Sequence, residues 1–144
     1  MAFVSLTRLR VRSYRYLLQF IWRALQTGRQ AELSSGFLSG KLLRESKNTF
    51  WTLTVWDNEA SMRTYRNAGA HRGVMPNLLE WCDEASVAHW NQETPELPNW
   101  QDAHQRMVKE GRRSKVNHPS LAHANDHIAA PRRSRIERIL KPAR

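Results

Sequence analysis

The sequence predicts an α+β fold: an antiparallel sheet in the chain order β-α-β-β-α-β, with helices on one face. Three observations predict it. Apolar and basic residues alternate from 7 to 12, apolar side chains recur at helical spacing from 14 to 25, and residues 49–56 (TFWTLTVW) are rich in β-branched and aromatic types. This order is the ferredoxin-like arrangement. The length of 144 residues leaves room for one such domain.

The first two elements follow from residue spacing. A strand is expected over 3–12, where one face carries Thr7, Leu9 and Val11 and the other carries three arginines: Arg8, Arg10 and Arg12. Ser13 is suited to cap the helix that follows. Gly28 marks the expected end of that helix.

A hairpin and two helices are expected next. Strands over 36–45 and 49–56 are joined by a turn at Lys47 and Asn48. Asp57 or Asn58 caps a helix that Gly69 interrupts. A further helix is expected to run to Cys82, and it tolerates Pro76 only near its start.

The last regular elements are a fourth strand over 85–92 and a short helix over 99–111. Three side chains of that helix are expected to dock it on the domain: Trp100, His104 and Met107. The antiparallel sheet then has helices on one face, and its other face needs a cover, commonly a second subunit.

The chain divides into a domain at 1–111 and a basic, largely disordered tail at 112–144. The tail holds nine Lys/Arg and two Asp/Glu, a charge of +7, whereas the domain holds fourteen and eleven, a charge of +3. All six tryptophans precede the tail, and such segregation is typical of a solvated segment. Residues 132–141 could form a short basic helix within it. Nucleic-acid binding by the tail is the weakest hypothesis, because the tail lacks aromatic residues that stack on bases.

The single cysteine, Cys82, excludes an intramolecular disulfide, which fits a reducing compartment. No uncharged stretch approaches the roughly 20 residues of a membrane helix. No signal-peptide pattern is present. We therefore expect a cytoplasmic protein without a membrane span.

The segment from Thr49 to Trp90 combines a strand ending in Trp56, an Asp-Asn-Glu helix start at 57–59 and a later His71. This pattern resembles the dimeric α/β-barrel superfamily, which includes antibiotic-biosynthesis monooxygenases and haem-degrading monooxygenases. It is most similar to an uncharacterised group likened to spheroidene monooxygenase. The resemblance covers residues 3–92 and implies a homodimer whose two sheets form a barrel, with a pocket between the sheet and the second-helix region.

Two functions follow from the resemblance. The first is a monooxygenase-like enzyme that acts on a small aromatic or polyketide-like substrate without metal or flavin, with three catalytic candidates: His71, Tyr65 and Arg10. The second is a non-catalytic dimer that binds haem or another small ligand, with His71 as the haem ligand. The expected cofactor is therefore none or haem, and the expected partners are a second copy and a small molecule.

Each candidate also has a structural explanation. The unperturbed pKa of His71 suits a general base, but the residue could instead cap the interrupted helix or contact the partner subunit. Arg8, Arg10 and Arg12 would bind an acidic substrate if their face lined a closed barrel, or they could pair with carboxylates. No metal site is expected, since His71, His89 and His104 lack ligand spacing.

The aromatic candidates also have both a functional and a structural explanation. Phe50 and Trp56 share a strand face and could wall a substrate pocket, or they could pack at a dimer interface. Tyr65 could donate a hydrogen bond to a substrate oxygen, or it could pack the helix on the sheet.

Overall fold

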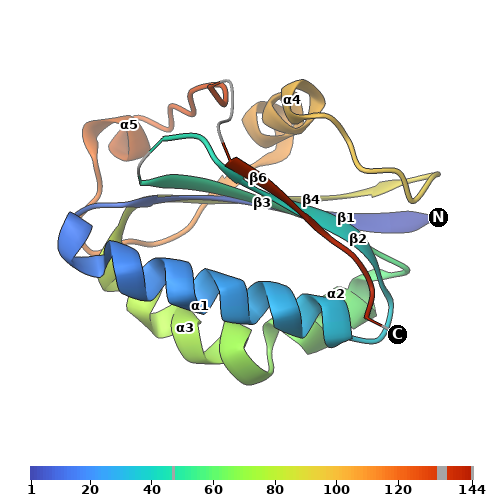
Figure 1. The fold of residues 1–144 in the computed structure, drawn as a ribbon. Helices are drawn as coiled ribbons and strands as arrows, with labels where there is room; N and C mark the ends of the chain where they lie inside the picture. Colours follow the sequence, from blue (N-terminus) through green and yellow to red (C-terminus); the bar gives the residue numbers. More distant parts are fainter. Residues whose placement is uncertain (47, 133–135, 144) are drawn as a thin grey trace.

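A six-stranded antiparallel sheet is the centre of the computed structural model, which describes residues 1–46, 48–132 and 136–143 (Figure 1). The strands lie in the order β5-β4-β1-β3-β2-β6. Their bounds are β1 Ala2–Val11, β2 Phe37–Arg44, β3 Thr49–Trp56, β4 Cys82–Gln92, β5 Arg112–Arg113 and β6 Ile136–Leu140. The predicted α+β class and the antiparallel sheet are confirmed. The predicted turn residue Lys47 lies outside the described residues.

Three helices cover one face of this sheet, which we call the helix face (Figure 1). They are α1 (Tyr14–Leu33), α2 (Glu59–Arg66) and α3 (Gly69–Trp81). Ser13 and Asn58 cap α1 and α2, because the side chain of each accepts a backbone N–H from the first turn. Gly69, at φ 55°, separates α2 from α3 as expected. Pro76 differs from expectation, since it lies well inside α3.

The opposite face, here called the α4 face, is covered by the chain's own α4 (Trp100–Glu110) and the segment that follows it (Figure 1). Ala103 and Met107 are buried against Trp51 and Leu53, and Trp100 packs beside them. The imidazole Nε2 of His104 lies 2.9 Å from the carbonyl oxygen of Ile128, which joins α4 to the later segment. The predicted docking of this helix is therefore confirmed, and this face has a cover that needs no second subunit.

The described part of residues 112–143 differs from the expected disordered tail. It forms β5, the short helix α5 (Leu121–Ala124) and β6, which pairs with β2 at the edge of the sheet. Three of its side chains are buried: Val116, His123 and Leu140. These three buried residues are isolated and far apart in sequence. No hydrophobic periodicity therefore indicated that they pack on the domain. The helix expected over 132–141 is wrong for 136–140, which is a strand, while residues 133–135 lie outside the described part.

The turn before β2 depends on Gly36. Its φ of 85° belongs to the left-handed region, and an added Cβ would collide with the side chains of Ser61 and Asp57. We expect Gly36→Ala to lower the free energy of unfolding by at least about 1–2 kcal/mol, measured by urea denaturation. Gly73→Ala is the control, because a Cβ there meets nothing within 4 Å and alanine favours a helix. Equal stability of the two variants would contradict this account.

Candidate functional site

The two faces of the sheet are closed to different degrees. On the α4 face, the central side chains are all buried: Val4, Leu6, Arg8, Trp51, Leu53, Val55, Ser86 and Ala88. On the helix face, Phe3, Thr54, Trp56 and Ala85 are buried, but seven side chains of the same strands are partly exposed: Ser5, Thr7, Leu9, Phe50, Thr52, Val87 and His89. Water therefore reaches the sheet beneath the helices. Side chains in the middle of a sheet stay accessible only where the covering layer leaves room for a ligand or for solvent.

The accessible part of the helix face has a polar centre. Ser5 of β1 stands opposite His89 of β4, and the next pair along, Thr7 and Thr52, joins β1 to β3. Aromatic side chains lie around this centre, with Phe3 and Trp56 paired on one side and Phe50 on the other. A few hydrogen-bonding groups inside an apolar surround is the usual composition of a small-molecule site.

His89 is the titratable group of this centre. Its ring lies 5.4 Å from the ring of Phe3, centroid to centroid. Burial lowers the pKa of His89 below its ordinary value, and the positive charge of Arg66 lowers it further. The imidazole is therefore neutral at pH 7 and can accept a proton.

Arg66 lies at the end of α2 and acts on two histidines. Its charge lowers the pKa of both His71 and His89, in each case after the larger effect of burial. Its guanidinium Nε donates to the side-chain oxygen of Asn67 at 3.5 Å. Among the described residues, no carboxylate lies within 4 Å of Arg66. A cation without a carboxylate partner, whose charge acts on a neutral imidazole, favours a ligand with negative charge.

Tyr65 and His71 lie together in the helix layer. The ring of Tyr65 lies 5.1 Å from Trp56 and 4.9 Å from His71, while its hydroxyl donates to the carbonyl of Thr27 at 3.1 Å. Burial raises the pKa of Tyr65, so its hydroxyl stays protonated. The ring Nδ1 of His71 lies 3.2 Å from the carbonyl oxygen of Arg66. Both polar atoms therefore have partners within the helix layer, which fits the packing and capping alternatives.

Arg8 and Arg10 lie on the α4 face, opposite Tyr65 and His71. Arg8 Nη1 donates to Glu84 Oε1 at 2.6 Å, and Arg8 Nη2 lies 3.9 Å from Glu45 Oε1. Arg10 Nη1 donates to the other oxygen of the same carboxylate, Glu84 Oε2, at 3.0 Å. The expected trio of His71, Tyr65 and Arg10 is therefore not one site. The alternation along β1 placed the arginines on one face, but it did not reveal on which face the helices pack.

Arg12 is separated from the other two arginines. β1 ends at Val11, so Arg12 lies in the turn before α1. It donates to the backbone carbonyl of Glu80, forms an ion pair with the Glu80 carboxylate, and stacks over the ring of Tyr16. The expected row of three arginines therefore does not form, and all three meet carboxylates.

Phe50 and Trp56 share one face of β3, as their parity predicted, and in the structure it is the helix face. Trp56 is fully buried between Phe37 and Tyr65, and Phe50 packs at 4.6 Å from Phe20. Phe50 is partly exposed beside the polar centre, whereas Trp56 belongs to the core. Neither residue lies on the face expected to meet a second sheet.

A surface groove of about 490 Å³ opens between the end of α1 and α2. None of its lining residues is charged, and most are polar. The lining consists of Gln30, Ser34, Ser35, Asn58, Ala60, Ser61, Thr64, Tyr65 and Ala68. Tyr65 therefore contributes to the groove and, through Trp56, to the core beneath the helices.

The described residues give haem no clear place. Haem carries two carboxylates, and the arginines expected to meet them are neutralised by Glu84 and Glu45 on the other face. The backbone carbonyl of Arg66 holds Nδ1 of His71, which leaves Nε2 as the ring atom that could ligate iron. The expected set of His71 with Arg8, Arg10 and Arg12 is therefore not assembled in one place, and as a set it does not fit haem. In the described part of the chain, no three His, Cys, Asp or Glu side chains converge to hold a metal ion. Nor does any described helix have the length and hydropathy to cross a membrane.

The sequence did not indicate His89 as a candidate residue of a small-molecule site, because this histidine was considered only as a metal ligand. The alternation of β4 already put His89 and Val87 on the face opposite Trp90 and Ala88. What the sequence lacked was a sign of which face stays accessible.

A family model described as "Domain of unknown function (DUF3291)" matches residues 17–113. No curated protein matches the chain. Solved structures share the fold, including a mutant of SnoaB, a cofactor-independent oxygenase from Streptomyces nogalater, at TM-score 0.54 and 18% identity, covering 66% of this chain and 98% of that one. Rv0793 from Mycobacterium tuberculosis matches at TM-score 0.58 and 10% identity, covering 65% and 97%. A conserved protein from Methanosarcina mazei Go1 matches at TM-score 0.57 and 14% identity, covering 65% and 94%.

Proposed function

Because the chain belongs to the DUF3291 family, whose description names no reaction, we propose its function from the site itself. The protein is a monooxygenase-like enzyme that takes a small, flat aromatic or polyketide-like molecule between its sheet and its helices. One observation carries this proposal: the polar centre of the helix face stays accessible, while the α4 face is sealed.

The proposed chemistry begins with a proton transfer. The neutral imidazole of His89 accepts a proton from an acidic C–H or O–H of the substrate, and Arg66 stabilises the anion that forms. Such an electron-rich anion can itself reduce O₂. For an activated CH₂ group the balance is CH₂ + O₂ → C=O + H₂O: the substrate supplies all four electrons, one oxygen atom stays in the product, and the other leaves as water.

The comparisons support the proposal at the level of the fold. SnoaB, which has this fold, is named as a cofactor-independent oxygenase. The pairing of a polar centre with aromatic walls suits a flat ligand, and the uncompensated charge of Arg66 suits an anion. The likeness to the group likened to spheroidene monooxygenase remains a prediction.

Oxygen consumption by the purified protein tests the proposal. With a panel of quinols and of aromatic compounds that carry an activated CH₂, we expect uptake of O₂, and we expect His89→Ala to lower kcat about 100-fold or more. The rate of the native protein should rise with pH through the lowered pKa of His89 and be level at pH 7. His127→Ala, at an exposed histidine, is the control.

Failure of every substrate, or equal rates in His89→Ala and His127→Ala, would reject this enzyme assignment. Titration of the same compounds in the absence of oxygen then separates the alternative: binding that depends on His89, without turnover, identifies a ligand-binding protein. A Soret band after haem addition would instead identify a haem-binding protein.

The homodimer also remains part of the proposal. Because α4 and the following segment cover the α4 face, the site beneath the helices needs no residue from a second copy. Light scattering gives the mass in solution, and a monomer with full activity would remove the dimer from the proposal while leaving the site intact.

A further inference from the structure

The outer side of α1 presents large apolar side chains to water. Four of them follow one another at helical spacing: Tyr14, Leu18, Trp22 and Leu25, with exposed fractions of 68%, 81%, 62% and 40%. Leu33, at 64%, extends the same side toward the end of the helix. We call these five residues the α1 ridge. A contiguous exposed apolar surface of this kind marks an interaction site.

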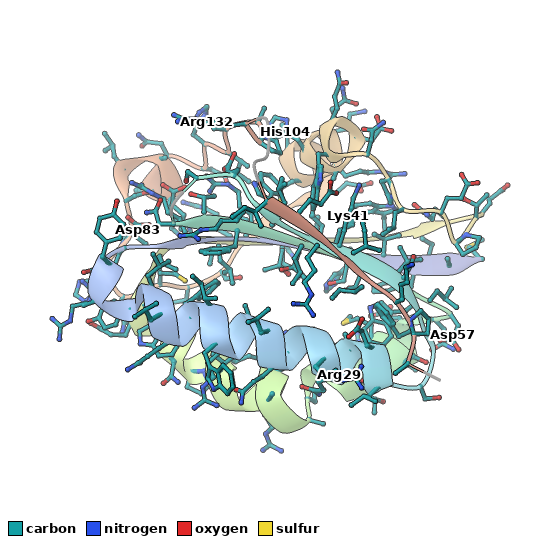
Figure 2. All side chains as sticks on the ribbon, in the orientation of Figure 1. Arg29, Lys41, Asp57, Asp83, His104 and Arg132 are labelled. Carbon is teal, nitrogen blue, oxygen red and sulfur yellow. The ribbon has the colours of Figure 1, made fainter. Side chains whose placement is uncertain are left out.

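The charges beside the ridge are basic. Arg15 and Arg29 lie on the same side of α1 and are both exposed, and Arg29 is labelled on this helix in Figure 2. The one acidic residue of α1, Glu32, is largely covered, accepts the backbone N–H of Lys141 and lies 3.6 Å from Arg29. The exposed side of α1 therefore combines apolar and cationic groups and offers a partner no exposed carboxylate.

A second copy of the chain is a poor partner for this surface. In an antiparallel pair of α1 helices centred on Trp22, Arg15 of one copy would lie beside Arg29 of the other, because each arginine is seven positions from Trp22. The same contact would occur twice across the two-fold axis. Like charges placed directly opposite one another disfavour this pairing.

An anionic lipid surface fits the same features. Leucine side chains enter the boundary of the acyl chains, tryptophan and tyrosine lie at headgroup level, and arginine heads reach the lipid phosphates. We propose that the α1 ridge docks this protein on the surface of a membrane rich in anionic lipids. This inference does not depend on the proposed oxygenase activity.

Co-sedimentation of the full-length protein with lipid vesicles tests the inference. We expect binding to vesicles of mixed phosphatidylglycerol and phosphatidylcholine, weak binding to phosphatidylcholine alone, and release by high salt. Leu18→Glu and Trp22→Glu should each lower the partition coefficient at least about tenfold. Val108→Glu is the matched control, because Val108 is an apolar residue of α4 with 61% exposure on the other side of the molecule.

Circular dichroism of each variant verifies that it is folded. Absence of binding to the mixed vesicles, equal binding by Leu18→Glu and Val108→Glu, or equal affinity for neutral and anionic vesicles would each overturn the proposal. A dimer that Leu18→Glu converts to a monomer, without vesicle binding, would also overturn it and would identify a second copy as the partner.

Discussion

Replacement of Arg8 by alanine is expected to lower the free energy of unfolding by about 3–5 kcal/mol at pH 7, as measured by urea denaturation. Arg8 is buried on the α4 face over the ring of Trp51, with Glu84 at 2.6 Å and Glu45 at 3.9 Å. Removing its guanidinium leaves two buried carboxylates with too little compensation. This loss of stability comes from leaving the carboxylates of Glu84 and Glu45 buried without their partner, rather than from the net contribution of the ion pair.

The control for this variant is Arg10→Ala. Arg10 also bonds to Glu84, but its side chain is 41% exposed, so water can replace it and the expected loss is about 1 kcal/mol or less. Equal losses for the two variants would contradict the view that burial decides the cost.

The effect of Arg8→Ala should also depend on pH. Burial acts to raise the pKa of the Glu84 carboxyl, but hydrogen bonds from Arg8 and Ser120 outweigh it, so the pKa in the native protein is lowered. The stability that Glu84 provides is therefore present above the ordinary carboxyl pKa of about 4.3 and lost as the pH falls through the folded value. Without Arg8, burial dominates and Glu84 takes up a proton more readily. The gap between the native protein and Arg8→Ala should narrow as the pH falls toward 4, and a constant gap would reject this mechanism.

Deletion of residues 112–144 is expected to cost about 3–6 kcal/mol or to prevent folding, because it exposes the surfaces that Leu140 and Val116 cover. It also removes Ser120, whose hydroxyl donates to Glu84 at 2.7 Å. A disordered tail would have no such effect. The measurement is the urea midpoint of the full chain against the truncated chain.

A matched pair of substitutions keeps this prediction testable if the deletion does not fold. Leu140→Ala should cost about 2–5 kcal/mol, because Leu140 is 2% exposed. Leu121→Ala, in the same segment at 80% exposure, should change stability by less than about 0.5 kcal/mol. Similar values for both would mean that the segment does not pack on the domain in solution.

Much of the fold could be predicted because its signals are local. The alternation in β1 and β3, the caps Ser13 and Asn58, and the break at Gly69 each depend on neighbouring residues. β6 could not be predicted, since its partner β2 is distant in sequence and four of its five residues are exposed.

The candidate site was less predictable for a related reason. The alternation of side chains along a strand divides its residues between two faces. It does not reveal which face the helices cover, or how much of that face they bury. The sequence therefore grouped Arg10 with Tyr65 and His71, although the sheet separates them, and it passed over His89, which shares the accessible face with Ser5 and Thr7.

The position of β6 has a consequence for biosynthesis. β6 follows β2 late in the chain, so the edge of β2 and the contact surface of Leu140 remain open until β6 has been synthesised. An unpaired strand edge invites pairing with other chains. A nascent chain should therefore depend on chaperones until β6 emerges, and a chain that stops before Ile136 should aggregate rather than fold as a slightly shortened protein.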